Sequence, residues 1–591
     1  MENKDKIWIF TFEYKEIAKV GGLGEVSSNH AKNLAEKYEI TVFIPSHGQL
    51  NRLYKTSSIK KLPFNCVGQL DPTIFGINRH ESSYSIGFYK FKKDNVNIIL
   101  LSGENNFTSS FLDDEIVYNP DTFSIKMCLY SIGIRSIIDF FIKECRQELP
   151  EIVHLHDYHV VIPFIGMKQV LKKYGLDLGS IITIHLLTWP RFDLNFYRAC
   201  GIDDTPIKVF TKDGYKEMNI KEIFIACEKK EFYHDNYEPP TVEKVGAYIS
   251  DMVTTVSKSY LDENIIPVLG FDLIGFKTDF IWNGCDWNYD LIINEVFNAF
   301  GDEMHKVLQL PKGSEITRED MKKYLLTYKI GNLSESPLIN SKKILEKIKQ
   351  ISTNNPYIKN GSIAPFDESG PLMITTGRIS PQKGFETIFE SIPQIIKHIP
   401  DAKLLFLLFP TDYSLKEMED FSEYIKQYPK NLRIIFGVTT EIYKFAHIVS
   451  DVYAALSRWE PFGITALEAM ASKLPVIATR VGGLQESVID IKNDPINGTG
   501  ILIDKDDPYE FAKSLISLFT LSRISNNPIE KKIETEQEIN SISDEVIKFI
   551  AINDNEYYNK MKENCIKRVN KYFRWNIVTA KLAILYDKIK K

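Results

Sequence analysis

Four charged residues in the second half of the sequence have the types and spacing needed to bind a phosphorylated sugar. Arg378 ends the apolar run LMITTGR, and Lys383 lies in the loop 379–384 before a helical pattern. Arg binds phosphate oxygens as a fork and Lys supplies a compact charge, so the two together suit a diphosphate. Glu460 and Glu468 follow further along the chain, and carboxylates are the acceptors that sugar or ribose hydroxyls need.

Residues 451–478 must position the two glutamates. The apolar run DVYAAL predicts a buried strand, and RWEPFG interrupts it because Pro and Gly cannot continue a strand. A helical run and a second apolar strand follow, so the loop lies at the carboxyl end of a strand, where open α/β sheets bind ligands. The first turn of a helix has unpaired backbone N–H groups that favour phosphate. We expect substrate contacts here from Phe462, Gly463, Ile464 and Thr465.

A glycine-rich turn near the start of the chain is a second candidate phosphate site. The buried-strand pattern of residues 7–14 leads into KVGGLGE, a helical stretch and a second strand, ITVFIPSHG. This is the first unit of a doubly wound fold. Gly21 and Gly22 would let the backbone approach a phosphate, and Lys19 adds a full charge. A tight turn before a helix would have the same sequence, so this signal is weak when taken alone.

Histidines gather at the end of another predicted strand. EIVHLHDYH contains His154, His156, Asp157 and His159, and SIITIHLL repeats the design with His185. Strand ends at one rim of a sheet are candidate site positions. Alternation puts the first two histidines on one face, but a zinc site needs further ligands and the second strand offers only one. We expect a hydrogen-bonded rim and no metal ion.

Composition limits the class of protein. The chain has 591 residues, a formal net charge of −6 and 44% hydrophobic residues, which fits two or three soluble domains and gives no bulk basic field for nucleic acid. No apolar run has the length of a membrane span, and the start lacks the features of a signal peptide. Seven scattered cysteines without a CxxC pair indicate free thiols. We therefore expect a cytoplasmic protein with neither nucleic acid nor a membrane as partner.

The strand–helix alternation occurs in two series. The first occupies about residues 1–280 and the second about 281–572, and each offers a glycine-bearing loop and a cation. Three polar or charged stretches interrupt the pattern, and we interpret them as insertions or linkers. They cover about residues 200–240, 333–370 and 520–545.

Several motifs in the expected order resemble those of bacterial and archaeal glycogen and starch synthases, glycosyltransferase family five. KVGGLGE resembles the family's Lys-x-Gly-Gly-Leu loop, and HLHDYH its His-x-His-Asp-aromatic-His element. TIH, NGCD and GRISPQKG match its Thr-x-His, Asn-Gly-x-Asp and Arg-x4-Lys elements. SRWEPFGITALEAM matches its Glu-x7-Glu element, and FRWNIVTAKLAILY resembles its final helix. The set covers most of the chain outside the three insertions and is highly specific.

The resemblance implies a GT-B fold, with two Rossmann-like domains facing a central cleft and a last helix, about 573–591, that returns to the first domain. It implies retaining transfer of glucose from ADP-glucose or UDP-glucose to the non-reducing end of an α-1,4-glucan, with no metal and no cofactor. The catalytic residues carried over by motif are His185, Arg378, Lys383 and Glu460. The substrate-binding residues carried over are Lys19, Gly21, Gly22, Asp157, Asn283, Phe462, Gly463, Ile464, Thr465 and Glu468.

Three positions depart from the family pattern. Glu25 stands where bacterial members usually have Asp, and Leu456 replaces a common Pro. Val438 stands where they often have a Tyr that stacks on adenine, so the sequence does not choose between ADP-glucose and UDP-glucose. It also leaves open the oligomeric state, including a homo-oligomer, and the role of the insertions.

Three other functions stay open on sequence grounds. A glycoside hydrolase could use Glu460 and Glu468 as its carboxylate pair, but it would not need a phosphate site. A related GT-B enzyme could act on a small acceptor, for example to form trehalose. A non-catalytic glucan- or nucleotide-sugar-binding protein would be expected to have lost the charged positions, which are intact here.

Overall fold

The computed structural model describes residues 4–78, 81–228, 238–311, 313–334, 337–339, 341–359, 362–526 and 532–591. The chain divides into two compact units. The N-terminal unit contains residues 1–283 and 575–591, and the C-terminal unit contains residues 284–574. The boundaries predicted from the sequence were 280/281 and about 573. Parts of all three predicted insertions, within 229–237, 335–336, 340, 360–361 and 527–531, lie outside the described residues.

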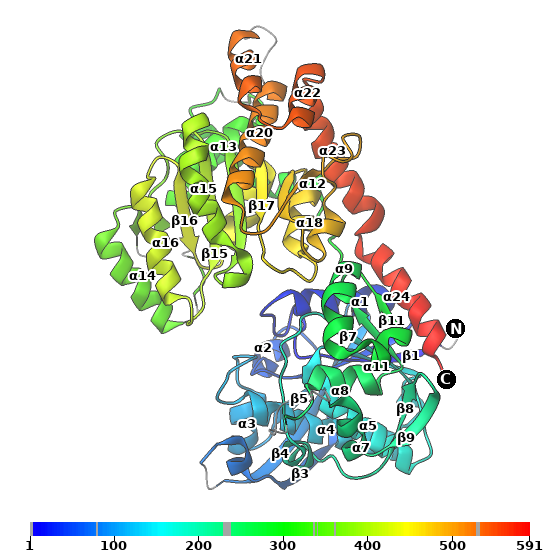
Figure 1. The fold of residues 1–591 in the computed structure, drawn as a ribbon. Coiled ribbons are helices and arrows are strands. Elements are labelled where there is room, and N and C mark those ends of the chain that lie inside the picture. The colour runs from blue at the N-terminus through cyan, green and yellow to red at the C-terminus, as the bar shows by residue number, and fades with distance from the viewer. Residues whose placement is uncertain are drawn as a thin grey trace. The chain divides into compact units, whose positions relative to one another are not determined.

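A nine-stranded sheet forms the centre of the N-terminal unit, in the order β11-β10-β7-β6-β1-β2-β5-β4-β3 (Figure 1). Strands β11 to β5 of this order pair in parallel, whereas β4 and β3 are antiparallel. The parallel strands are covered on both faces and therefore read as apolar runs. The strands are Lys6–Phe10 (β1), Glu39–Pro45 (β2), Lys60–Gln69 (β3), Ser83–Lys93 (β4), Val96–Gly103 (β5), Ile152–His156 (β6), Gly179–Ile184 (β7), Met252–Thr255 (β10) and Thr278–Phe280 (β11).

Helices of the N-terminal unit cover this sheet, and the chain's last helix is one of them. Helix α24 contacts α1 and β7, and the Tyr586 hydroxyl reaches His154 in β6. The main helices are Gly22–Leu34 (α1), Asn106–Leu112 (α3), Phe123–Glu144 (α4), Val161–Lys173 (α5), Leu194–Ala199 (α6), Val242–Ile249 (α8) and Trp575–Ile589 (α24). Shorter helices are Leu50–Tyr54 (α2), Lys258–Tyr260 (α9), Ile266–Leu269 (α10) and Phe271–Ile274 (α11).

The described part of the 200–240 stretch is ordered structure packed into the N-terminal unit. It forms the antiparallel hairpin Ile207–Thr211 (β8) and Gly214–Met218 (β9), followed by helix Ile220–Cys227 (α7). Val209 and Phe224 are fully buried in the main apolar core. The hairpin also holds the chain end, because Lys591 lies over the Tyr215 ring and forms an ion pair with Asp251 at 3.2 Å.

The C-terminal unit contains a six-stranded parallel sheet in the order β16-β15-β14-β17-β18-β19 (Figure 1). The order reverses between β14 and β17, which is the topological switch point where such sheets bind ligands. The strands are Leu372–Arg378 (β14), Lys403–Phe409 (β15), Leu432–Phe436 (β16), Val452–Ala455 (β17), Val476–Thr479 (β18) and Gly500–Ile503 (β19). A two-residue pair, Ile358–Lys359 (β12) and Ser362–Ile363 (β13), lies outside this sheet.

Helices flank this second sheet. The sequence Thr317-Arg-Glu-Asp320 predicts a capping box at a helix start, and Thr317 and Asp320 do exchange hydrogen bonds at 3.0 and 3.1 Å. The helices are Tyr289–Val307 (α12), Arg318–Thr327 (α13), Lys342–Asn354 (α14), Phe385–His398 (α15), Leu415–Gln427 (α16), Thr440–Val449 (α17), Ile464–Ala471 (α18), Leu484–Ser487 (α19), Pro508–Asn526 (α20), Lys532–Ser541 (α21), Glu545–Asn553 (α22) and Tyr557–Tyr572 (α23). None of the helices in the described part of the chain combines the length and apolar character needed to cross a bilayer.

Two interpretations of the insertions need correction. Residues 333–370 are not simply a linker, because α14 buries Ile344, Ile348 and Ile351 in the core of the C-terminal unit. These residues follow one face of the helix, and the run SKKILEKIKQI within this stretch predicts a helix there, so only the interpretation as a linker was wrong. The described part of 520–545 is helical and so is not simply a linker either, because α20 continues to Asn526 and α21 follows.

Candidate active site

In the C-terminal unit, Lys383 and Glu460 meet where neighbouring strands β14 and β17 end. The Lys383 Nζ lies 2.5 Å from Glu460 Oε2, and the Ser457 hydroxyl donates to the same oxygen at 3.0 Å. Both charged side chains are largely covered, with 21% and 13% of their side-chain surface exposed. Arg378 ends β14 and is exposed, and it forms no ion pair within the described parts of the chain. Of the two cations, Arg378 is therefore the one that is free to meet an anion.

Glycines allow the loops around this pair to pack closely. Gly384, directly after Lys383, has φ +61°, and a Cβ there would lie 2.3 Å from the carbonyl oxygen of Leu456. Gly482 has φ +44°, and its Cβ would lie 1.9 Å from the carbonyl oxygen of Glu460. L-residues with side chains are disfavoured at both positions. The loop 481–487, VGGLQES, therefore packs closely against the loop that contains Glu460.

The start of α18 follows Glu460. Gly463 is the N-cap with φ +92°, and no side chain caps this helix end. Ile464 and Thr465 form its first turn, whose N–H groups have no carbonyl of a preceding turn to bond. The Phe462 side chain is buried and contacts the Phe573 ring, so only the Phe462 backbone can contribute to a site.

Glu468 lies one turn further along α18 and is half-buried. It accepts a hydrogen bond of 2.9 Å from the Tyr443 hydroxyl of α17. Tyr443 itself packs against His447 and Trp287. The carboxylate is therefore held in one orientation by a buried phenol.

In the N-terminal unit, the glycine-rich loop already has a carboxylate partner. Glu13 is buried, and its Oε2 accepts from the N–H groups of Val20 at 2.7 Å and Gly21 at 2.9 Å. The Tyr118 hydroxyl donates to the other oxygen at 2.6 Å. Two loop amides that the sequence offered to a phosphate are thus occupied within the chain. Gly22, the other predicted glycine, is the first residue of α1.

Lys19 is paired as well. Its Nζ lies 2.7 Å from Glu25, which also binds Lys15 at 2.8 Å. Burial acts to raise the pKa of Glu25, but the two lysines outweigh burial and the pKa lies below its usual value. Lys19 is nevertheless 41% exposed and can turn toward an anion.

Asp157 and His185 meet at the ends of β6 and β7. Asp157 has φ +62°, an unusual value for a residue with a side chain, and its Oδ1 accepts the His185 N–H at 2.7 Å. Burial raises the pKa of Asp157 to about 8. His185 Nε2 lies 2.9 Å from His156 Nδ1, and burial lowers the pKa of His185 to about 3, so its ring is neutral at pH 7.

The prediction of a fully hydrogen-bonded rim is only partly right. His154 is satisfied at both ring nitrogens, by Tyr586 at 2.8 Å and Thr183 at 2.7 Å. His156 Nε2, His159 Nδ1 and Asn283 Oδ1 are buried and have no hydrogen-bond partner among the described residues. The sequence showed which residues share a face but not which atoms find partners, because those partners come from distant elements.

Residues 6–276 match the model of the starch synthase catalytic domain, and residues 358–535 match that of glycosyl transferases group 1. The glycogen synthase of Protochlamydia amoebophila is 22% identical over 84% of this chain and 88% of its own length. That of Chlamydia trachomatis serovar L2 is 24% identical over 88% and 94%.

The chain belongs to the glycogen and starch synthase family. The fold agrees, since the catalytic domain of starch synthase IV from Arabidopsis thaliana, solved with ADP and acarbose, superimposes with a TM-score of 0.63. That likeness covers 99% of each chain at 16% identity. Both Rossmann-like units are those of a GT-B glycosyltransferase.

Two further residues of this family member stand out in the structure and were missed in the sequence. Trp189 follows the β7 end, is 55% exposed and has φ +56°. Its N–H and that of Thr188 donate to buried Glu243, both at 2.9 Å, so the exposed indole has a fixed backbone. Its position four residues after His185 was the available signal. Glu13 is the other missed residue, and nothing near it in the sequence indicates its role.

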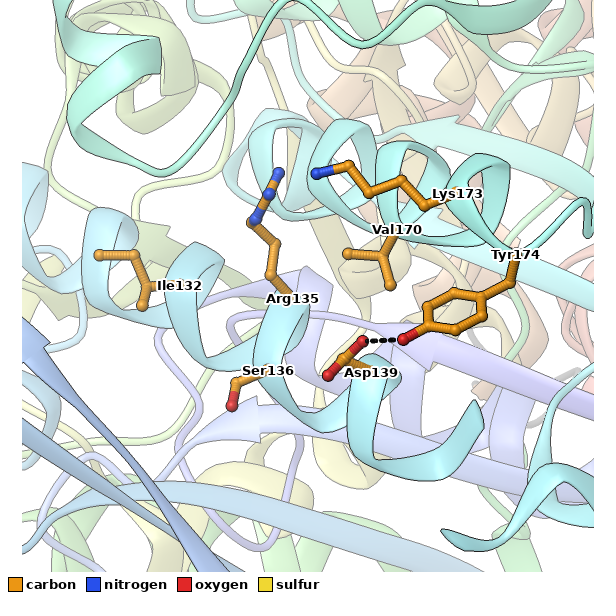
Figure 2. Close-up of a pocket in the computed structure, with 7 residues that line it drawn as sticks. All are labelled: Ile132, Arg135, Ser136, Asp139, Val170, Lys173 and Tyr174. Carbon is orange, nitrogen blue, oxygen red and sulfur yellow. Dashed lines mark hydrogen bonds between the residues drawn. The ribbon is translucent and has the colours of Figure 1, made fainter. Parts of the chain in front are cut away.

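A separate hollow of about 570 Å³ lies between α4 and α5 of the N-terminal unit (Figure 2). The Tyr174 hydroxyl donates to Asp139 across it at 2.7 Å. Arg135, Lys173, Ile132, Ser136 and Val170 also line it. It contains none of the residues predicted to bind the substrate.

Proposed function

We propose that this glycogen/starch synthase family member transfers glucose from ADP-glucose or UDP-glucose to the non-reducing end of an α-1,4-glucan. The anomeric configuration is retained and the reaction needs no metal ion. The observation that carries the proposal is the grouping of Arg378, Lys383 and Glu460 at the switch point of the C-terminal sheet. Residues 77 positions apart form one cluster of cations and an acceptor, which is what a nucleotide-sugar donor requires.

The leaving group sets the main chemical demand. Cleavage at the anomeric carbon leaves negative charge on the diphosphate, and fixed cations stabilise that charge as it develops. Arg378 contacts the diphosphate directly. Lys383 is held in place by its ion pair with Glu460, and its ammonium group also contacts the phosphate when the donor binds. The N–H groups of Gly463, Ile464 and Thr465 add hydrogen bonds and the positive end of the α18 dipole.

Carboxylates orient the donor. Glu460 accepts from sugar hydroxyls, and Glu468 accepts from the ribose while Tyr443 holds its other oxygen. A carboxylate oxygen has room for more than one donor, so both can keep their protein partners. Val438, which follows β16, is exposed and has no ring to stack on a base. The choice between adenine and uracil is therefore left to experiment.

The N-terminal unit contributes further groups that contact the substrates. His185 is a neutral imidazole that can hydrogen-bond the glucose and the reacting centre, and Asp157 fixes its backbone. Lys19 leaves its ion pair with Glu25 and binds the donor phosphates. Asn283, whose buried Oδ1 has no partner among the described residues, is available for a substrate hydroxyl.

Incorporation of labelled glucose tests the proposal. The full chain is incubated with glycogen and either labelled ADP-glucose or UDP-glucose in the presence of EDTA, and label in precipitated glucan is measured. We expect α-1,4-linked product from at least one donor, with retention of configuration visible by NMR. Product from small acceptors only, or no transfer with either donor, would overturn it. An acceptor panel of maltooligosaccharides and free glucose phosphates separates a glucan synthase from a small-acceptor enzyme.

A further inference from the structure

Three buried histidines of the N-terminal unit converge beneath the strand ends. His154 and His156 point to the same face of β6, with ring centroids 4.2 Å apart. His30 comes from α1, with its ring 6.1 Å from His154 and 5.8 Å from His156. One nitrogen of each ring lies within 4.8 Å of the others, and all three residues are at most 2% exposed.

Some ring nitrogens of these histidines have no hydrogen-bond partner among the described residues. Both nitrogens of His30 and the Nε2 of His156 have no hydrogen-bond partner in the described part of the protein. A buried polar atom without a partner is costly, and native structures supply a partner for most of them. A ligand shared by the three rings would give such atoms a partner.

His154 and His156 have outer partners of the kind that metal-binding histidines use. The second nitrogen of His156 is bonded to His185 at 2.9 Å. His154 is bonded to the Tyr586 and Thr183 hydroxyls and can keep one of these bonds while the other nitrogen binds an ion. A metal-bound histidine almost always uses its other nitrogen in this way, which fixes the ring.

We propose that His30, His154 and His156 form a buried site for a divalent transition metal ion, with Zn²⁺ the expected occupant. Three imidazoles and one open position are an established zinc set. Tetrahedral Zn–N bonds of about 2.05 Å place the nitrogens about 3.4 Å apart. The present separations, which are within 4.8 Å, therefore shorten by up to about 1.4 Å through side-chain rotation. Burial lowers the pKa of His30 to about 3, so its nitrogens are free of the extra proton at pH 7.

The ion acts as a clamp and takes no part in glucosyl transfer. It joins α1, which follows the Lys19 loop, to β6, which precedes Asp157. If the proposed function is right, it has one further effect. With Nε2 of His156 on the metal, Nδ1 must carry the proton and donate to His185 Nε2, which sets the tautomer of His185.

Metal analysis of the full chain tests the site without reference to activity. The protein is purified without a metal-affinity column, loaded with Zn²⁺ and dialysed, and zinc per chain is measured by mass spectrometry. We expect about one ion per chain in the wild type and less than a tenth in His30→Leu. His447→Phe, which alters a buried histidine in the C-terminal unit, is the matched control and should keep its zinc. Wild-type zinc below a tenth per chain, or equal zinc in His30→Leu, would overturn the proposal.

Cobalt gives a second readout that does not require the variant to fold. Wild-type protein loaded with Co²⁺ should show the intense visible bands of a four-coordinate ion, and a crystal structure should show an anomalous peak among the three rings. An ordered water without anomalous signal in the metal-loaded crystal would refute the site. Glycosyl transfer can succeed or fail independently of either result.

Discussion

The strand ends of the two Rossmann-like units contrast in how they handle charge. In the C-terminal unit, Arg378 is exposed and Lys383 pairs with Glu460 at 2.5 Å, so formal charges gather where β14 and β17 end. In the N-terminal unit, the ends of β6 and β7 present imidazoles with lowered pKa values and Asp157, whose pKa burial raises to about 8. Repeating one architecture therefore does not repeat its chemistry.

The difference indicates a division of labour. Charge that develops on a leaving diphosphate needs fixed cations, whereas a sugar ring needs hydrogen bonds from neutral groups that exclude water. Burial decides which unit supplies charged groups and which supplies neutral ones, because a buried charge without a partner is costly and titrates to its neutral form. Four changes test this contrast, in decreasing order of expected effect.

Removing a cation from the C-terminal unit should have the largest effect. We expect Arg378→Ala or Lys383→Ala to lower kcat by about 10²-fold or more, because each loses a charge that stabilises the leaving group. Steady-state kinetics with saturating glycogen measures this. Lys347→Ala is a matched control, since Lys347 is also a largely covered lysine in an ion pair of 2.5 Å. Near-normal turnover in either site variant would reject the assigned roles.

The C-terminal unit also contains a buried neutral histidine, and it should respond to pH as the N-terminal histidines do. Burial lowers the pKa of His447 to about 4, so the unfolded chain binds its proton first and stability falls as pH drops from about 6.5 toward 4. The slope is at most about 1.4 kcal/mol per pH unit for one group. His447→Phe should reduce the fall in the urea midpoint between pH 7 and pH 5.

Exposed His398 supplies the control for that measurement, and His398→Phe should leave the fall unchanged. An identical fall in His447→Phe and wild type would show that burial of this ring does not govern the acid response.

A smaller effect should follow from removing the exposed aromatic ring of the N-terminal unit. Trp189→Ala should raise the KM for glucan about 3- to 10-fold with kcat within about twofold, because the apolar face of a sugar packed on the indole would bury surface worth on the order of 1 kcal/mol. Tyr413→Ala, at an 85% exposed ring of the C-terminal unit, should change neither constant. A loss confined to kcat would instead place the indole at the reacting centre.

The smallest effect should come from Glu25→Asp, which restores the family's usual residue. Glu25 is 19% exposed and its lysine partners are 41–49% exposed, and ion pairs of this kind contribute about 0–1 kcal/mol. We expect the donor KM to change by less than about threefold. A change above tenfold, measured by varying the donor at saturating glycogen, would show that the extra methylene matters to the donor site.

Much of the fold could be predicted because it depends on local patterns. Apolar runs covered on both faces predict parallel strands, and the capping box at Thr317 marks a helix start with atoms only three residues apart. The same reasoning predicted the helix within 333–370 but took the stretch for a linker, because a local pattern does not show that the apolar face of α14 packs into the core. At the site, the candidate residues could be chosen by type and motif, but not their partners.

The sequence by itself determined the alternation of strands and helices, the family, and the residues able to carry charge, because periodicity and motif spacing are properties of the chain. Only the tertiary structure decided that Glu13 occupies the amides of the glycine loop, that Glu460 neutralises Lys383, and that His30 meets the histidines of β6. Each of these contacts joins separate elements, and the fold of the N-terminal unit brings β6 and α1 together although about 120 residues separate them. Packing, which no local pattern encodes, places those atoms.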